Sequence, residues 1–219
     1  VKKEEGRLLE MSDIVYYVSP LTLLYQRKEF PEFANKMKWH PLPSYYKREL
    51  TSVNFDTLVF GYFGDYSPNI RNLKSFYNVA LKMGLKVNIC GNSSLRLQSK
   101  KFVNVYPRMG LKELEAYEKQ TNVLVFICNL MGGQIPGKIY QYAATNKLVL
   151  FILDGTKEEK EVLYKYFSAF NRFIFCENNE ASIEEAILGL RNKKFGESYR
   201  TPLLNFTPVN IIQKILEGK

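Results

Sequence analysis

The sequence predicts an α/β fold in which a doubly wound parallel sheet is covered by helices on both faces. Short apolar runs alternate with amphipathic stretches along most of the 219 residues. Two of these runs, 123–128 and 148–153, are apolar at every position, which is typical of parallel strands buried on both faces. Glycine or small polar residues follow several of the expected strands, which is where such sheets bind ligands.

The first part of the chain is less regular than the rest. We expect a strand at 13–19 and a helix at 21–30. A proline-rich, aromatic linker is expected from 31 to 50; it contains His40, which we expect to be a structural or surface residue. The chain begins with Val1 and a charged run, with no apolar signal segment, so we expect it to be part of a longer protein.

From residue 57 onward, strands and helices alternate regularly. The strand 57–60 enters a glycine loop at 61–68 and then an amphipathic helix that Gly84 is expected to end. The strand 86–91 completes a βαβ unit, whose crossover is expected to be right-handed. Further strands are expected at 102–106, 123–128, 148–153 and 173–176. Further helices are expected at 111–120, from about 136, at 158–170, around 183–190 and around 209–216.

The composition is that of a globular chain with a sizeable core, since 46% of the residues are hydrophobic and 24% are charged. No apolar run approaches the roughly 18 residues that a membrane span requires. The three cysteines each close an expected apolar strand, so we expect reduced core thiols at Cys90, Cys128 and Cys176. With one His and no close cysteine pair, no metal site is expected.

The net charge of +9 has two interpretations. It could form a patch for an acidic partner such as a nucleotide, a phosphorylated lipid, a membrane surface or a nucleic acid. Because the basic residues are spread through the chain, we favour solvated helix faces for most of this charge. The sequence carries no RNA- or DNA-binding motif, so no nucleic-acid partner is expected.

In a doubly wound sheet, the binding site lies beyond the carboxyl ends of the strands. The loops expected there are 61–68, 91–94, 106–110 and 129–138. The pair Gly61 and Gly64 is a weak signal, because it lacks the third glycine of a dinucleotide-binding loop. A tight turn and a phosphate contact explain this pair equally well.

The stretch from Gly132 to Tyr142 is more specific. It places Gly132, Gly133 and Lys138 at the start of an expected helix, where backbone N–H groups, the helix dipole and a cation favour an anion. We expect this anion to be a phosphate. The alternative is a surface lysine on an ordinary helix.

Several stretches resemble GT-B-fold glycosyltransferases that use nucleotide-activated sugars. Residues 135–150 (Ile-Pro-Gly-Lys-Ile-Tyr-Gln-Tyr-Ala-Ala-Thr-Asn-Lys-Leu-Val-Leu) are similar to that family's P-x-K-(L/I)-(F/Y)-E-Y-(L/M)-A-x-G-K-P-V-(I/L) segment. Residues 13–19, 60–64 and 115–128 resemble the strand that ends its acceptor lobe, the loop that opens its donor lobe and a later donor-lobe segment. The resemblance implies the end of the acceptor lobe and a linker at 1–50, a Rossmann-like donor lobe at 51–206, and a crossing helix at 207–219.

The resemblance also implies roles for particular residues. Lys138 would be catalytic by neutralising the leaving diphosphate, and amides near Gly64 and Gly132 would add hydrogen bonds. Tyr106 and Arg108 occupy the loop beside the nucleobase. The glutamate that contacts the ribose in the family is a glutamine here. The implied donor-binding set is Gly61, Gly64, Tyr106, Arg108, Gly132, Gly133, Ile135, Pro136, Lys138 and Gln141.

We therefore expect the donor lobe of a glycosyltransferase that takes a nucleoside diphosphate sugar, serves a saccharide or lipid-linked acceptor, and uses no metal or cofactor. A role in polysaccharide biosynthesis is expected, in the cytoplasm or on the inner face of the membrane as a peripheral protein. The chain alone is expected to be inactive, because the acceptor lobe is missing from it.

Two alternatives stay open. One is a non-catalytic nucleotide-sugar-binding or scaffold domain, which Gln141 favours. The other is an unrelated dehydrogenase or epimerase, which the incomplete glycine pattern disfavours. The residues leave open the sugar, the base, the acceptor and the stereochemical outcome.

Overall fold

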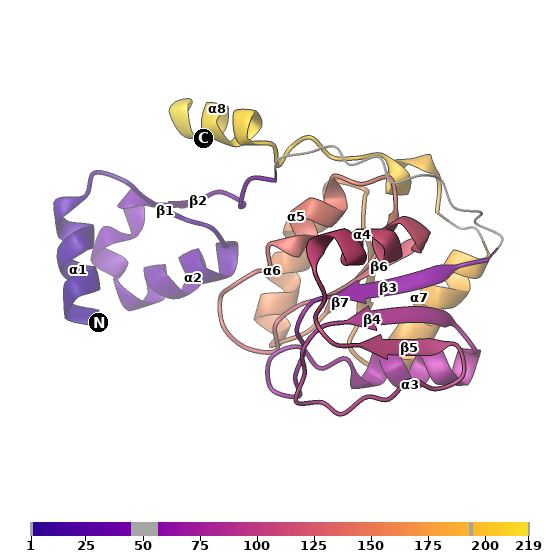
Figure 1. Ribbon diagram of the computed structural model, residues 1–219. Coiled ribbons are helices and arrows are strands. Elements are labelled where there is room, and N and C mark those ends of the chain that lie inside the picture. The colour runs from indigo at the N-terminus through magenta and orange to yellow at the C-terminus, as the bar shows by residue number, and fades with distance from the viewer. Residues whose placement is uncertain (1, 45–56, 193–194, 219) are drawn as a thin grey trace.

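The main body of the molecule is a six-stranded sheet in the order β5-β4-β3-β6-β7-β8, and its paired strands run parallel. The computed structural model describes residues 2–44, 57–192 and 195–218. The strands are β3 (Val59–Phe63), β4 (Lys86–Cys90), β5 (Val103–Tyr106), β6 (Val123–Ile127), β7 (Leu148–Leu153) and β8 (Ile174–Glu177). The topology switches between β3 and β6, which lie side by side (Figure 1). The expected doubly wound fold is confirmed.

The two apolar runs form central strands, as expected. Every residue of β6 and β7 is buried. Alternate side chains enter two different cores: Val125 and Leu150 point into one, and Phe126 and Phe151 point into the other. The three cysteines are free and buried, which confirms the expected core thiols.

Helices cover both faces of this sheet. Side chains of α3 (Lys74–Met83) and α7 (Glu180–Arg191) share the first core. Side chains of α5 (Lys138–Ala143) and α6 (Lys157–Ser168) share the second core, and α4 (Leu111–Gln120) packs partly against it. Both cores are apolar because each helix turns one stripe of side chains toward the sheet.

A smaller N-terminal unit lies beside the body (Figure 1). It consists of α1 (Lys2–Met11), β1 (Val15–Tyr17), α2 (Pro20–Glu29), the 3-10 helix η1 (Pro31–Lys36) and β2 (Met37–Trp39). Its own core is small, with four buried apolar residues: Leu9, Leu23, Phe30 and Met37. The strand and helix expected near its start are present as β1 and α2.

Two features of this unit differ from expectation. Helix α1 was not predicted, and the expected linker from 31 begins instead with η1 and β2. Strand β2 pairs in parallel with β1, with Val15 opposite Met37. Three residues are too few to show a strand periodicity, so only the pairing reveals this strand.

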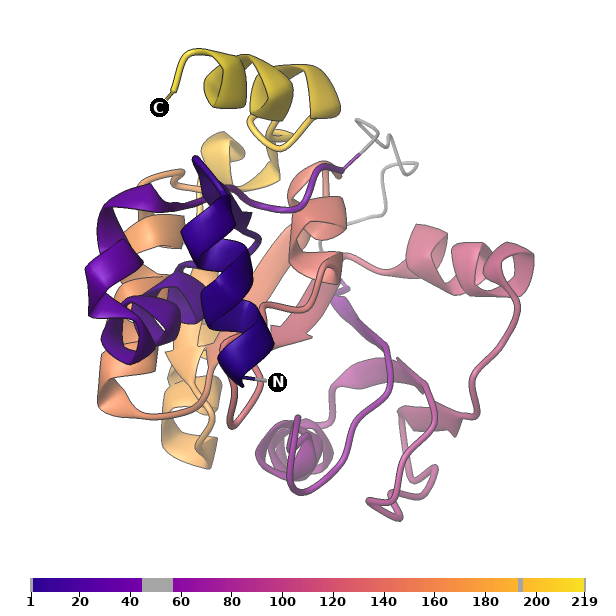
Figure 2. The same cartoon turned by 90° about the vertical axis from the view of Figure 1, so that its left-hand side faces the viewer.

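The C-terminal part of the chain consists of the 3-10 helix η2 (Glu197–Arg200) and α8 (Pro208–Leu216). It returns to the N-terminal side, where Ser44 N donates to Phe206 O at 2.6 Å and Lys38 Nζ donates to Gly218 O at 2.5 Å. Figure 2 shows α8 and α1 on the same side of the molecule. The domain limits at 50 and 206 stay predictions, and residues 45–56 lie outside the described part. Within that part, no helix is both long and apolar enough to cross a membrane.

Candidate functional site

The loops that follow β3, β4 and β5 are joined at the carboxyl edge of the sheet. Gly64 N donates to Cys90 O at 2.9 Å, and Gly91 N donates to Tyr106 O at 3.2 Å. A Cβ on Gly91 would lie 2.0 Å from Gly64 O, so the first two loops approach more closely than any side chain permits. In Figure 1 the carboxyl ends of β3 and β4 point toward the N-terminal unit.

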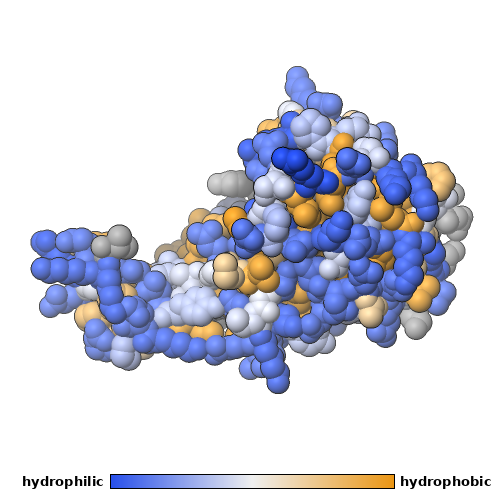
Figure 3. Space-filling view, turned by 90° about the horizontal axis from the view of Figure 1, so that it is seen from below, coloured by the Kyte–Doolittle hydropathy of each residue, from blue (hydrophilic) through white to orange (hydrophobic). Residues whose placement is uncertain are grey.

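The loop after β6 joins the same edge. Leu130 N donates to Ile70 O at 2.6 Å, which links this loop to the segment between β3 and α3 across the topological switch. The edge of the sheet expected to bind a ligand is therefore one continuous set of loops. Seen from below, the surface is notched where the N-terminal unit projects from the body (Figure 3).

Arg71 lies at this edge beside Gly64. A Cβ on Gly64 would be 3.7 Å from Arg71 Nη1 and 3.8 Å from the Tyr62 hydroxyl. Burial raises the pKa of Tyr62 to about 12, although the nearby Arg71 charge acts in the opposite direction. Among the described residues, the buried Arg71 Nε has no hydrogen-bond partner. The guanidinium therefore keeps donor capacity that the described residues do not use.

Arg108 belongs to a polar cluster on the same edge. Its guanidinium lies 3.5 Å from Asp65 Oδ2, and its backbone N donates to Asn92 Oδ1 at 3.4 Å. Asp65 Oδ1 in turn accepts a hydrogen bond from Asn92 N at 2.9 Å. The Tyr106 ring packs against Tyr117 with 5.0 Å between the ring centroids. The cluster ties the loops after β3, β4 and β5 together through side chains.

Lys138 is the first residue of α5, two residues later than the expected helix start. Its Nζ lies 3.6 Å from Glu118 Oε1 of α4 and 5.8 Å from the centre of the Tyr142 ring. Glu118 is almost fully buried. The anion that this lysine meets in the structure is therefore a carboxylate of the protein.

The loop between β6 and α5 carries the remaining expected residues. Gly132 is exposed and has a φ of 90°, whereas Gly133 packs against α2. The Ile135 side chain is buried in the second core, beside a small hollow that Pro136 also lines. Gln141 is exposed on α5.

The structure gathers most of the expected residues at one edge, but it changes the interpretation of Gly61 and Gly64. The expectation that Gly61 opens a loop is wrong, because β3 continues through Phe63 and Gly61 lies inside the strand. The amide of Gly64 is already used by Cys90 O. Donor contact by either glycine stays a prediction.

Two residues at this edge were not found from the sequence. Glu118 pairs with Lys138, and Thr22 of α2 donates to Gly133 O at 2.8 Å across 111 positions of the chain. Neither contact leaves a local pattern, since each joins elements that are far apart in the sequence.

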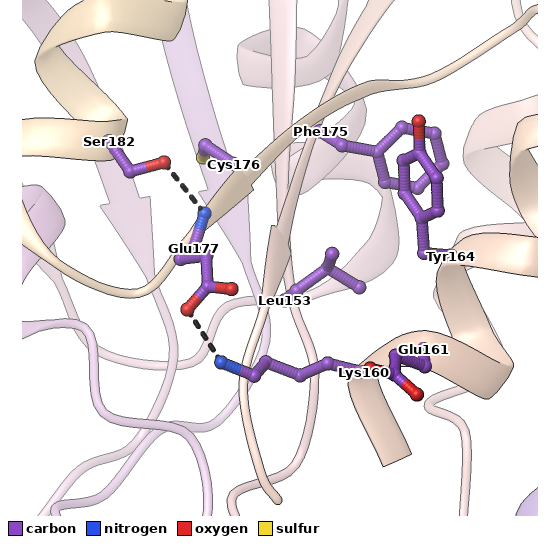
Figure 4. Close-up of a pocket in the computed structure, with 8 residues that line it drawn as sticks. All are labelled: Leu153, Lys160, Glu161, Tyr164, Phe175, Cys176, Glu177 and Ser182. Atoms are coloured by element: carbon purple, nitrogen blue, oxygen red, sulfur yellow. Dashed lines mark hydrogen bonds and ion pairs between the residues drawn. The ribbon is translucent and has the colours of Figure 1, made fainter. Parts of the chain in front are cut away.

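A second hollow lies at the ends of β7 and β8, where α6 and α7 begin (Figure 4). Lys160 Nζ pairs with Glu177 Oε2 at 2.5 Å, and the Tyr164 and Phe175 rings meet edge to face with 5.0 Å between centroids. None of its lining residues belongs to the expected donor-binding set.

No protein-family model and no curated protein sequence matches the chain. Solved structures do match in fold. The Anabaena protein HepE in complex with UDP and glucose superposes with a TM-score of 0.67 at 11% identity, over 94% of this chain and 62% of HepE. A glycosyltransferase from Rickettsia africae ESF-5 superposes with a TM-score of 0.72 at 12% identity, over 99% of this chain and 65% of that protein.

A third similar structure is S. aureus MnaA with UDP, at a TM-score of 0.52 and 11% identity, over 95% of this chain and 62% of MnaA. The chain thus spans less than two thirds of the length of each of these proteins. These similarities, together with the strand order, establish a GT-B-like fold in which the six-stranded body is one Rossmann-like lobe.

Proposed function

We propose that this chain is the donor lobe of a glycosyltransferase and binds a nucleoside diphosphate sugar at the joined loops. The observation that carries the proposal is the placement of cationic side chains, Arg71 and Lys138 among them, around loops that meet at the topological switch. UDP in the similar structures of HepE and MnaA supports the choice of ligand class.

Arg71 and Lys138 would carry different parts of the diphosphate charge. Arg71 Nη1 lies beside Gly64, so its guanidinium is placed to contact a phosphate there. Lys138 must leave or share Glu118 before its ammonium can neutralise the leaving diphosphate. Glu118 is therefore a competitor of the donor for the same cation.

The proposal extends to the reaction of the full-length protein. The glycosyl group would pass to a saccharide or lipid-linked acceptor held by the rest of the protein, in polysaccharide biosynthesis, with residues 1–50 and 207–219 leading to the acceptor side. Catalysis would need no metal, and this chain alone would bind the donor without transferring its sugar. We propose a cytoplasmic location, with peripheral membrane contact of the full-length protein.

The test is a calorimetry and thermal-shift panel of UDP, GDP, ADP, CMP and NAD. One nucleoside diphosphate is expected to bind, and at about 100 times its dissociation constant it stabilises the fold by about 2.7 kcal/mol. Lys138→Ala and Arg71→Ala are expected to weaken this nucleotide about tenfold or more, since each removes a charge-assisted contact. Binding of NAD alone, or of no nucleotide, contradicts the proposal.

A substitution of Glu118 tests directly whether Lys138 exchanges this carboxylate for the donor phosphate. Glu118→Gln removes the competing charge, so it is expected to tighten nucleotide binding several-fold. Glu115→Gln, one turn earlier on the same helix, is the matched control and is expected to leave affinity unchanged. Equal affinity in both variants would mean that Lys138 does not exchange Glu118 for phosphate.

A non-catalytic nucleotide-sugar-binding domain is the second candidate, because Gln141 is exposed on α5 where the resembled family has glutamate. Sugar transfer by the full-length protein separates the two candidates. Restoration of transfer by Gln141→Glu would identify a catalytic lobe that has lost one contact.

A further inference from the structure

Helix α2 belongs to the N-terminal unit, yet it rests on the loop between β6 and α5. Thr22 Oγ1 donates to Gly133 O at 2.8 Å, across 111 positions of the chain. Leu21, the preceding residue, is buried in the second core of the body together with Ile135. Two adjacent residues of α2 therefore pack on the second half of this loop, at Gly133 and Ile135.

The contact between Thr22 and Gly133 involves backbone as well as the hydroxyl. A Cβ on Gly133 would lie 2.9 Å from Thr22 N, Cα and Oγ1. Two of these three atoms belong to the backbone and cannot rotate away. The loop backbone is thus seated directly on the first turn of α2.

A second hydrogen bond holds α2 one turn further along. Tyr25 OH donates to Glu159 Oε1 at 2.6 Å, and this bond raises the pKa of Tyr25 to about 12. Glu159 is itself buried and accepts from Thr156 N at 2.7 Å in the capping box of α6. Since Thr22 and Tyr25 are three residues apart on a helix, both bonds lie on the same face of α2.

The part of the chain that the structure describes offers this loop few other hydrogen bonds. Leu130 N bonds Ile70 O, and Asn129 Nδ2 donates to Gln134 O at 3.2 Å. Between these points Met131 is 70% exposed, and a Cβ added to Gly132 would meet no atom of the described residues within 4 Å. The centre of the loop is consequently held from outside, by Thr22.

We infer that Thr22 is a positioning residue, through which α2 holds the loop 129–137 in the conformation that receives the donor. The inference rests on the proposed function for the identity of the ligand, since Gly132, Gly133 and Lys138 belong to the proposed donor site. It adds that donor affinity depends on a helix outside the donor lobe, and on one hydroxyl of that helix in particular.

The test uses Thr22→Val, which keeps the shape of the side chain and removes its hydroxyl. Thr22→Ser is the rescue variant because it retains the hydroxyl. Lys28→Ala is the matched control on the same helix, since within residues 2–44, 57–192 and 195–218 Lys28 forms only an exposed ion pair, with Glu158 at 2.9 Å. Hydrogen exchange of the amides at 130–137 and affinity for UDP, or for the nucleoside diphosphate that the panel identifies, are measured for each variant.

Thr22→Val is expected to speed exchange in this loop and to weaken nucleotide binding, each about tenfold, because Gly133 O loses its hydrogen bond. Thr22→Ser and Lys28→Ala are expected to stay within about twofold of the wild type. Tyr25→Phe provides a second variant, and it is expected to raise exchange in the same loop to a smaller degree.

Several outcomes would overturn the inference. The first is unchanged hydrogen exchange of the amides at 130–137 in Thr22→Val. The second is faster hydrogen exchange spread evenly over the whole body. The third is faster hydrogen exchange at 130–137 with unchanged nucleotide affinity. Failure of the wild type to bind any nucleotide instead removes the proposed function. In that case loop exchange alone decides whether Thr22 holds the loop, and unchanged exchange overturns that as well.

Discussion

Lys147 and Arg172 are two cations buried at the amino edge of the sheet, on the side opposite the candidate site. Lys147 is 2% exposed, and its Nζ donates to Lys119 O at 3.1 Å, near the end of α4. Arg172 is fully buried and donates to carbonyl oxygens in the turn that follows α5. Lys147 therefore satisfies a carbonyl in the last turn of α4, and Arg172 satisfies carbonyls between α5 and β7.

Burial lowers the pKa of Lys147 to about 8. Between this value and the unfolded value of about 10.4, the unfolded chain keeps a proton that the folded protein has released, so the Lys147 contribution to the free energy of unfolding rises with pH. Lys147→Met lacks this titrating group. Between pH 7 and pH 9.5 we therefore expect the free energy of unfolding of the wild type to rise by about 2 kcal/mol relative to that of Lys147→Met. Urea unfolding of both proteins at both pH values measures this change. Lys157→Met, at a side chain that is 90% exposed, is the control. A difference independent of pH would contradict the prediction.

Arg172 carries a larger structural role. Its Nη2 donates to Thr145 O at 2.7 Å and Lys147 O at 2.5 Å, and its Nη1 donates to Tyr199 O. Arg172→Met leaves these carbonyls unpaired, so we expect a loss of about 3 kcal/mol or more in the free energy of unfolding. Denaturant unfolding beside the wild type tests this, and a loss below about 1 kcal/mol would show that water replaces the guanidinium.

Among the elements, several strands and helices of the body end at residues that the local sequence indicates. Gly84 ends α3 with a φ of 63°, in the left-handed region that favours glycine. Helix α4 occupies the expected range, Leu111–Gln120. Helix α5 begins at Lys138, and the carbonyls of Pro136 and Gly137 accept hydrogen bonds from Ile139 N and Tyr140 N, each at 3.2 Å.

Gly84 and Gly110 form a matched pair for testing this reasoning. If a Cβ were added, neither would meet an atom of the residues that the structure describes within 4 Å, but Gly84 has a φ of 63° and Gly110 a φ of −66°. Gly84→Ala is expected to cost about 1 kcal/mol from backbone strain alone. Gly110→Ala is expected to stay within about 0.5 kcal/mol of the wild type. Equal effects in thermal unfolding would show that φ does not decide the cost.

At the scale of the whole molecule, the N-terminal unit depends on the body for its stability. Its own core has four buried apolar residues, too few to support an independent fold. It contacts the body through Thr22 and Tyr25 of α2 and through Trp39, whose ring meets Tyr166 edge to face at 4.6 Å. The body, in contrast, has two large cores of its own.

Trp39 is the only tryptophan in the chain and therefore reports on this contact. We expect its fluorescence to change at a lower urea concentration than far-UV circular dichroism, because the unit detaches before the sheet unfolds. Tyr166→Leu is expected to increase the difference in urea concentration between the two transitions, because it removes the aromatic contact with Trp39. Coincident transitions in the wild type would instead mean that the unit and the body unfold as one.

The body and the edge of its sheet could be predicted from sequence because their signals are local. The apolar runs of β6 and β7, the stop at Gly84 and the glycine-containing loops at the carboxyl ends each occupy a short stretch. Strand β2 could not be predicted, since it exists through its pairing with β1. The same holds for the partners of Lys138 and Gly133, which come from α4 and α2.

The sequence alone thus predicted the class of fold, the order of the elements in the body and the edge of the sheet where a ligand is expected. These follow from periodicity and turn chemistry, which act over a few residues. Only the tertiary structure decided that Lys138 faces Glu118, that Arg71 lies beside Gly64, and that α2 supports the loop at Gly133. Contacts of this kind depend on how whole elements pack in space, and no local pattern of residues encodes them.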